Sequence, residues 1–325
     1  MPAALRMVMR MFLHVLFAFI AFAAVISMAV LLSMVTFDVP DSELVAKYGQ
    51  PPSKFMTLPG GACVHYRDQG LADGRALVLL HGSNASLHIW EPWVKALGNE
   101  FRVITVDLPG HGLTGAVPGD DYGEKGMVEF VGAFMSGLGV ERFALGGSSM
   151  GGGVAAHYAI AHGERLTKLI LVDATGFPSK TPMDAGFGPQ LAKTPVLQNL
   201  VLYITPRGFF EEGYKKSVYD PKVVTPEMVD MVWQLNLKRG TRAATLIRFN
   251  LPEDTTIREK ATQITVPTLL IWGDKDGIIP LDVGQAYRDA IKGSQLIVYH
   301  DVGHVPPIEM PERSAEAVRS FLEKS

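Results

Sequence analysis

The chain has 325 residues, a formal net charge of −3 and a sequence pI near 6.3. This length suits one large α/β domain with an insertion or two small domains, and the slightly acidic balance gives no indication of a nucleic-acid partner. Cys63 is the only cysteine, which excludes an intramolecular disulfide framework and leaves too few thiols for a zinc–thiolate site.

The first feature along the chain is an apolar N-terminal segment. From Met11 to Phe37 the only ionisable side chain is His14. A bilayer core of roughly 30 Å needs about 20 apolar helical residues, so this segment is long enough to span it with some tilt. We predict an uncleaved membrane anchor over residues 1–37. The alternatives are a buried helix and a cleaved signal peptide, for which Ala21–Ala24 imitates a cleavage site within the apolar run.

The flanks of this segment predict its orientation. Arg6 and Arg10 precede it, whereas acidic side chains outnumber basic ones in residues 38–47. The positive-inside tendency then keeps the N-terminus cytoplasmic and places the bulk of the chain on the extracytoplasmic, periplasmic side. Residues 38–61 are rich in proline and glycine and are predicted to form a linker into the folded domain.

From about residue 62 the chain alternates short apolar runs with longer amphipathic ones. Runs rich in β-branched or aliphatic residues predict buried strands, and the segments between them have helical patterns. This alternation predicts an α/β fold with a mostly parallel sheet flanked by helices, in a core formed by residues 62–177 and 263–325. The predicted strands are Ala76–Leu80, Val103–Val106, Phe143–Leu145, Lys168–Val172, Thr268–Trp272 and Leu296–Tyr299. The predicted helices are Glu91–Leu97, Lys125–Leu138, Gly151–Ala161, Leu281–Ile291 and Pro311–Lys324.

The alternation stops over residues 178–262, which lack strong strand patterns. Thr225, Pro226 and Glu227 form a helix start, with a capping hydroxyl, proline at the first helical position and an early carboxylate. We therefore predict a helical insertion between two strands of the core.

The strongest chemical motif is Gly147-Ser148-Ser149-Met150-Gly151, directly after a predicted strand and before a predicted helix. A serine on such a tight turn is strained and needs small neighbours, and its hydroxyl points out of the sheet edge. A competing interpretation is a dinucleotide fingerprint over Gly151–Ala156 with Asp173 as the ribose-binding acid. Its first glycine would fall within the helix and not at the strand end, so we disfavour that interpretation and predict no cofactor.

A second motif, His81-Gly82-Ser83-Asn84, also ends a predicted strand. Acyl transfer builds negative charge on the former carbonyl oxygen, which preorganised backbone N–H groups stabilise. We predict an oxyanion hole formed by the amides of Ser83 and Met150, with Asn84 as the alternative to Ser83.

Two further strand ends supply a candidate acid and base. Asp274 and Asp276 follow the predicted strand Thr268–Trp272, and His304 follows the last predicted strand. A serine hydroxyl needs a histidine to take its proton, and the imidazole needs a carboxylate that fixes its tautomer. The order serine, aspartate, histidine is the one expected of α/β-hydrolases.

These motifs together resemble α/β-hydrolases of the group that includes bacterial carboxylesterases, lipases and meta-cleavage product hydrolases. The resemblance covers residues 60–325 and implies that residues 178–262 form a helical cap over the active site. The family's aspartate lies four residues before a proline, which corresponds to Asp276 before Pro280. The catalytic residues implied are therefore Ser149, His304 and Asp276. The matching motifs are His81-Gly82 with Trp90, Asp107–Gly112, Gly147–Gly152, Gly273–Pro280, and Gly303–Pro306 with Glu309.

The resemblance implies a serine hydrolase that cleaves an ester-like acyl bond of a small molecule or a lipid. Carbon–carbon hydrolases of the group usually carry a glycine-rich oxyanion loop and a tryptophan after the histidine, whereas this chain has Ser83-Asn84-Ala85 and Val305. The alternatives are carbon–carbon bond hydrolysis, cofactor-free perhydrolysis, and a membrane-tethered binding protein that has kept the fold. His157 and His162 are not spaced as a metal pair, His111 is expected to be structural, and no metal site is predicted.

Overall fold

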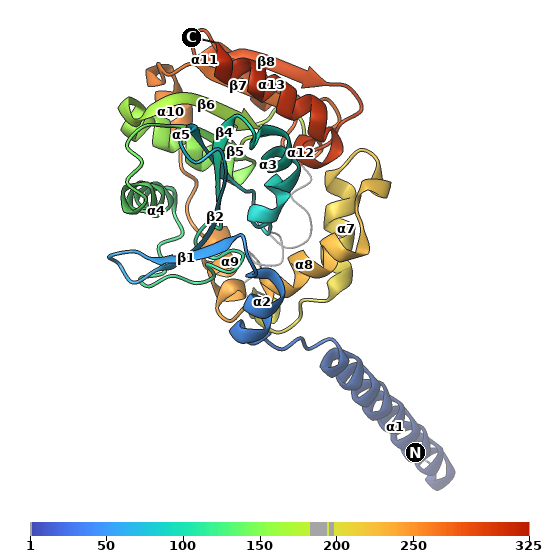
Figure 1. The fold of residues 1–325 in the computed structure, drawn as a ribbon. Coiled ribbons are helices and arrows are strands. Elements are labelled where there is room, and N and C mark those ends of the chain that lie inside the picture. Colours follow the sequence, from blue (N-terminus) through green and yellow to red (C-terminus); the bar gives the residue numbers. More distant parts are fainter. Residues whose placement is uncertain (1, 183–193, 195–197, 325) are drawn as a thin grey trace.

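The computed structural model describes residues 2–182, 194 and 198–324. Its elements alternate between strands and helices along most of the chain (Figure 1). The strands are β1 Ser53–Thr57, β2 Cys63–Gly70, β3 Arg75–Leu80, β4 Phe101–Val106, β5 Phe143–Ser148, β6 Leu166–Val172, β7 Thr268–Gly273 and β8 Gln295–Tyr299. The α-helices are α1 Ala3–Ser33, α2 Asp41–Tyr48, α3 Glu91–Leu97, α4 Glu124–Gly137, α5 Met150–His162, α7 Arg207–Ser217, α8 Pro226–Asn236, α9 Thr241–Phe249, α10 Thr256–Lys260, α11 Leu281–Ala290, α12 Pro306–Glu309 and α13 Pro311–Glu323.

One eight-stranded sheet organises the molecule, with the order β1-β2-β4-β3-β5-β6-β7-β8. The pairs β1–β2 and β2–β4 are antiparallel, and the pairs from β4 through β8 are parallel. This confirms the predicted mostly parallel α/β fold and all six predicted strands. The carboxyl ends of β5, β6, β7 and β8 therefore meet at one edge, where open α/β sheets bind their ligands.

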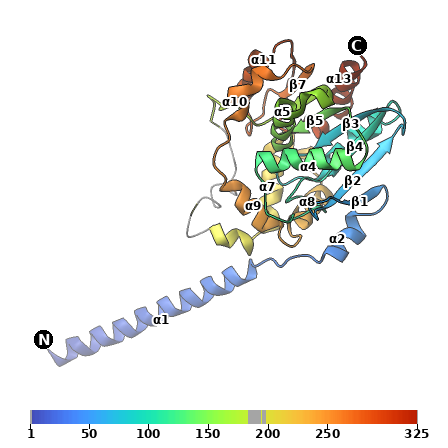
Figure 2. The same cartoon turned by 90° about the vertical axis from the view of Figure 1, so that its left-hand side faces the viewer.

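Successive residues of each central strand face opposite sides of the sheet, which produces two apolar layers. On β3, Val78 and Leu80 pack into the cluster that includes α4 and α5, whereas Leu77 and Leu79 pack into the cluster that includes α3 and α13. Figure 2 shows α4 and α5 side by side. Because both faces are covered, the strands read as continuous apolar runs in the sequence.

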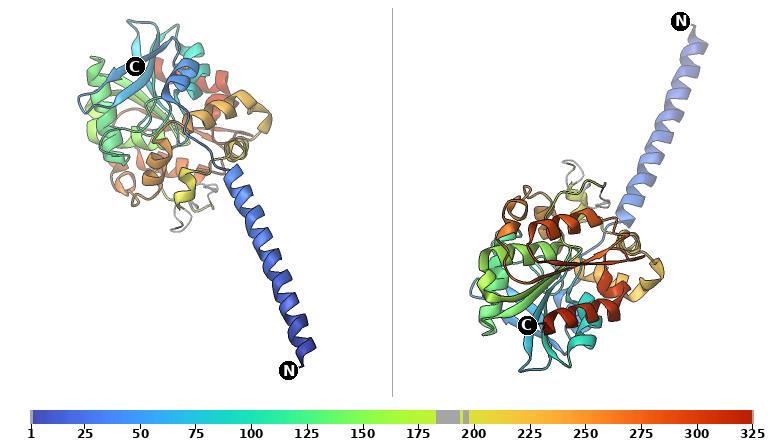
Figure 3. Two further views of the ribbon diagram at one scale, coloured as in Figure 1. Left: turned by 90° about the horizontal axis from the view of Figure 1, so that it is seen from below. Right: turned by 90° about the horizontal axis from the view of Figure 1, so that it is seen from above.

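Helix α1 projects away from the rest of the protein (Figures 1 and 3). Its described side chains are exposed. Within the described residues, this is the one helix long and apolar enough to cross a membrane, over Ala4–Val30. A signal sequence near the N-terminus meets the same criterion.

The segment 38–61, predicted as a linker, contains α2 and β1, and β1 pairs with β2. The sheet therefore begins at Ser53 and not near residue 62. Helix α2 docks because Leu44, which is 1% exposed, packs against Leu113 and Leu235. These partners are distant in sequence, so a local pattern of prolines and glycines does not reveal the contact.

Residues 198–263 lie between β6 and β7, and we call them the cap segment. They contain α7, α8, α9 and α10 and no strand. The predicted helix start is confirmed, because the Thr225 hydroxyl accepts a hydrogen bond from Met228 N at the start of α8. Part of the predicted insertion, residues 183–193 and 195–197, lies outside the described residues.

The cap segment also binds the chain that follows α1. Thr36 N donates to Tyr203 O at 2.7 Å, Arg242 pairs with Asp38 at 2.5 Å, and Lys238 pairs with Asp41 at 2.5 Å. The segment that leads out of the apolar helix is therefore attached to the cap segment, and α2 contacts α8.

Candidate active site

Ser149 lies between β5 and α5 with φ 55° and ψ −120°, a backbone conformation that costs energy for a residue with a side chain. Its N–H donates to Val172 O at 2.9 Å, and its carbonyl accepts from Gly153 N and Thr175 N at 3.1 Å each. The neighbours must be small, since a Cβ on Gly147 would lie 2.2 Å from the Gly151 carbonyl oxygen. These contacts hold the strained turn predicted for a nucleophilic serine.

The loop after β3 lies against this serine. A Cβ on Gly82 would be 3.1 Å from Ser149 Cβ and 3.7 Å from Ser149 Oγ. Met150 is the first residue of the 13-residue helix α5, whose N-terminus carries partial positive charge. In the part of the chain that the structure describes, the amides of Ser83 and Met150 donate no hydrogen bond, so both are available to a ligand.

His304 and Asp276 form a buried pair at the ends of β8 and β7. His304 Nδ1 lies 2.7 Å from Asp276 Oδ2, and the two residues are 7% and 6% exposed. The other carboxylate oxygen of Asp276 accepts from Ile278 N at 2.8 Å and Ile279 N at 2.9 Å. Three donors therefore hold this carboxylate in one orientation.

Asp274, the alternative acid, points elsewhere. Its Oδ2 lies 2.9 Å from His300 Nδ1, and the His300 side chain is 89% exposed. The histidine at the sheet edge is thus paired with Asp276 and not with Asp274. No hydrogen bond between Ser149 Oγ and His304 is present among the described residues, so the proton transfer between them stays a prediction.

Comparison with known proteins identifies the family. A sequence model of the alpha/beta hydrolase fold family matches residues 75–311. The chain belongs to the α/β-hydrolase fold family.

Relatives of this α/β-hydrolase carry different activities. It is 28% identical to Lipase 1 of Psychrobacter immobilis, over 83% of this chain and 84% of that protein. It is 30% identical to a 2-hydroxy-6-oxononadienedioate/2-hydroxy-6-oxononatrienedioate hydrolase of Paraburkholderia phymatum, over 83% of this chain and 95% of that protein. Among solved structures, a bacterial membrane phospholipase A matches with a TM-score of 0.70 and 23% identity over 97% of this chain and 98% of that one. The last likeness shows a shared fold.

A second buried acid, Asp173, stands beside the His304–Asp276 pair in this hydrolase. Side-chain atoms of the three residues lie within 4.8 Å of one another. Asp173 Oδ1 accepts from Gly273 N at 3.0 Å, and Oδ2 is buried without a hydrogen-bond partner. Burial, and then the charge of Asp276, raise the pKa of Asp173 well above its ordinary value.

From the sequence, Asp173 is named only as the ribose-binding acid of the disfavoured dinucleotide fingerprint and not as a residue of this site. Its position after β6, between the strand before Ser149 and the strand before Asp276, was a signal that it would reach the same edge. Three such side chains have donor atoms suited to a metal ion, but His304 and Asp276 are already joined by a direct hydrogen bond. That arrangement suits an acid–base pair.

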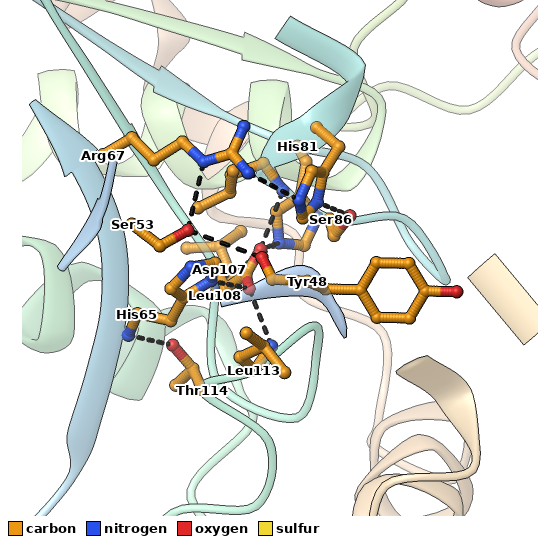
Figure 4. Close-up of polar contacts among 12 residues, drawn as sticks. Tyr48, Ser53, His65, Arg67, His81, Ser86, Asp107, Leu108, Leu113 and Thr114 are labelled. Atoms are coloured by element: carbon orange, nitrogen blue, oxygen red, sulfur yellow. Dashed lines mark hydrogen bonds and ion pairs between the residues drawn. The ribbon is translucent and has the colours of Figure 1, made fainter. Parts of the chain in front are cut away.

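A buried polar cluster is centred on Asp107 and includes residues of the loops after β3 and β4 (Figure 4). Asp107 Oδ2 lies 2.6 Å from His65 Nδ1 and accepts from Leu113 N at 2.7 Å, while Oδ1 accepts from Leu87 N at 2.7 Å. Although burial opposes the charge, His65 and the nearby imidazoles lower the pKa of Asp107. His81 joins the cluster through Nε2, which accepts from Leu108 N at 3.0 Å. The cluster therefore holds the loops after β3 and β4 together.

Three further histidines also have side-chain partners: His65, His88 and His300. Besides the His65 and His300 pairs above, His88 Nε2 lies 3.0 Å from Arg67 Nη2 and His88 Nδ1 lies 2.9 Å from Ser86 Oγ. Burial, the largest cause, lowers the pKa of His88 to about 4. His111 is buried with Nδ1 2.9 Å from the Pro109 carbonyl oxygen, in keeping with the expected structural role.

Proposed function

We propose that this protein is a serine hydrolase that cleaves an ester-like acyl bond with Ser149, His304 and Asp276. The observation that carries the proposal is the 2.7 Å His304–Asp276 contact at the sheet edge where Ser149 occupies its strained turn. Nucleophilic acyl transfer requires a serine hydroxyl and an imidazole that a carboxylate orients.

The proposed reaction has two steps. His304 Nε2 takes the Ser149 proton as Ser149 Oγ bonds to the acyl carbon, and the amides of Ser83 and Met150 stabilise the oxyanion. The carbon–oxygen bond of the ester then breaks, and the alcohol leaves with the proton from His304. Water, deprotonated by His304, attacks the acyl-enzyme and releases the acid and Ser149. Asp276 keeps the proton on His304 Nδ1 throughout.

The proposed substrate is a small ester or a lipid ester. Lipase relatives and the apolar N-terminal helix support a lipid source. The relatives also include carbon–carbon bond hydrolases, which support a second candidate, hydrolysis of a vinylogous diketone. Comparing the turnover of short p-nitrophenyl esters with that of a meta-cleavage product separates the two, because each hypothesis requires its own substrate to be turned over faster.

The proposed location is the membrane. We propose that residues 1–37 anchor the protein, that residues 62–177 and 263–325 form the hydrolase core, and that residues 178–262 form the cap. Arg6 and Arg10 favour a cytoplasmic N-terminus and a hydrolase domain on the periplasmic side. A reporter enzyme that is active only outside the cytoplasm should be active when it is fused after Ser325. An inactive fusion that lies in the cytoplasm would reverse the proposed orientation.

A fluorophosphonate probe tests the nucleophile. Wild-type protein should be labelled at Ser149, and Ser149→Ala should not be labelled. Ser148→Ala is a matched control, since that hydroxyl is buried next to the nucleophile, and its protein should still react. Folded wild-type protein that resists the probe would exclude Ser149 as the nucleophile.

A further inference from the structure

An arginine of the cap segment contacts Ser83 in the loop after β3. Arg248 lies in the last turn of α9, four residues after Ala244, so both occupy one face of the helix. That face lies over the loop after β4, because a Cβ on Gly110 would be 3.0 Å from Ala244 Cβ. Arg248 Nη2 donates a 2.7 Å hydrogen bond to Ser83 Oγ. The guanidinium therefore sits beside the residue whose amide is the proposed oxyanion donor.

Among the described residues, Ser83 is the hydrogen-bond partner of the guanidinium. No ion pair joins Arg248 to any carboxylate of the described residues, and its Nε is buried without a hydrogen bond. Its Nη1 also makes no hydrogen bond to a described residue, and the residue is only partly buried. Burial lowers the pKa of Arg248 to about 10, which leaves it charged at neutral pH.

Among the described carboxylates, Glu124 acts on this charge and raises the pKa of Arg248, but it forms no ion pair with the guanidinium. The nearby His81 and His111 are buried, and burial is the main cause that lowers the pKa of each, with the Arg248 charge acting in the same direction. The ring of Phe249, 4.5 Å from the Arg248 guanidinium carbon, and the helix end contribute only partial negative charge. A partly buried charge that forms no ion pair with a described carboxylate is destabilising, and proteins retain such costs mainly at functional sites.

We propose that Arg248 forms an anion subsite beside the loop after β3. This subsite selects esters that carry a carboxylate or a phosphate group a few bonds from the scissile bond. Arginine suits this role because its planar donors match the oxygen atoms of both groups. The proposal rests on the proposed serine hydrolase activity and adds the class of substrate.

The test compares kcat/KM for matched pairs of esters that differ in charge. The carboxylate pair is the mono-p-nitrophenyl ester of glutaric acid against p-nitrophenyl valerate. The phosphate pair is lysophosphatidic acid against the monoacylglycerol with the same acyl chain. In Arg248→Met the ratio of anionic to neutral substrate should fall by about 10- to 100-fold for at least one pair. The pair that responds identifies the anionic group.

Two further variants sharpen the comparison. Arg248→Lys keeps the charge without the planar donors, so its ratio should lie between those of wild type and Arg248→Met. Arg239→Met removes an exposed arginine close to α9, and its ratio should equal that of wild type. The melting temperature of Arg248→Met should equal or exceed that of wild type, because a partly buried charge without an ion-pair partner among the described residues is replaced by an apolar side chain.

Three results would overturn the subsite. Both ratios could stay unchanged in Arg248→Met, Arg239→Met could lower them equally, or Arg248→Met could lose both substrates of each pair in parallel with a lower melting temperature. The last result would make Arg248 a structural contact of the cap segment. Wild-type protein that cleaves none of the esters and resists the fluorophosphonate would instead refute the proposed function itself, and the subsite with it.

Discussion

Replacing Asp276 with asparagine should abolish most of the activity while leaving the fold intact. The amides of Ile278 and Ile279 both donate to Asp276 Oδ1, so the asparagine must place its carbonyl oxygen there. Its amide nitrogen then faces His304 Nδ1, which lies 2.7 Å from the wild-type Oδ2. Because that nitrogen can only donate, His304 Nδ1 must accept, and the imidazole proton moves to Nε2. A protonated Nε2 cannot accept the Ser149 proton.

The loss should be about 10⁴-fold in kcat, as found when a triad aspartate is exchanged for asparagine, which corresponds to about 5 kcal/mol of transition-state stabilisation. Asp274→Asn is the matched control, because Asp274 also pairs with a histidine but with the exposed His300. Its kcat should stay within a few-fold of wild type. The assay is steady-state hydrolysis of p-nitrophenyl butyrate, with melting temperatures to check folding. An Asp276→Asn protein that keeps a tenth of the activity, or an Asp274→Asn protein that loses as much, would refute this assignment of the acid.

Three further predictions concern stability and access. Because the pKa of Asp173 is raised in the folded protein, its contribution to the free energy of unfolding is present below the ordinary value of 3.8 and is lost as pH rises through the folded pKa. Asp173→Asn should therefore be more stable than wild type in urea at pH 8. The pKa of His88 is lowered to about 4, so its contribution to the free energy of unfolding is present above pH 6.5 and falls by up to about 3 kcal/mol towards pH 4. The free energy of unfolding should therefore depend less steeply on pH in His88→Gln than in wild type. An unchanged slope would contradict this. Gly82→Ala should reduce kcat/KM without unfolding the protein, because the new Cβ lies 3.1 Å from Ser149 Cβ; a variant as active as wild type would show that the loop gives way.

Much of the sheet and the candidate catalytic groups could be predicted from local patterns. Apolar runs of strand length predicted β3 to β8, since parallel strands buried on both faces need continuous apolar residues. Ser149, Asp276 and His304 each follow such a run, and the carboxyl ends of parallel strands share an edge. The choice of Asp276 over Asp274 needed the family pattern, because both aspartates follow the same strand. In the structure His304 pairs with Asp276.

Other features depend on contacts between residues far apart in the chain. Strands β1 and β2 were not predicted, because their pairing with each other and with β4 stabilises short runs that have weak patterns alone. His65 and Asp107 are 42 residues apart, and Arg248 and Ser83 are 165 apart. The sequence by itself determined the element order and the candidate chemistry, since periodicity and turn residues act locally. Only the tertiary structure decided which buried charges meet and where the cap segment contacts the loop after β3, because those contacts follow from how the helices pack over the sheet.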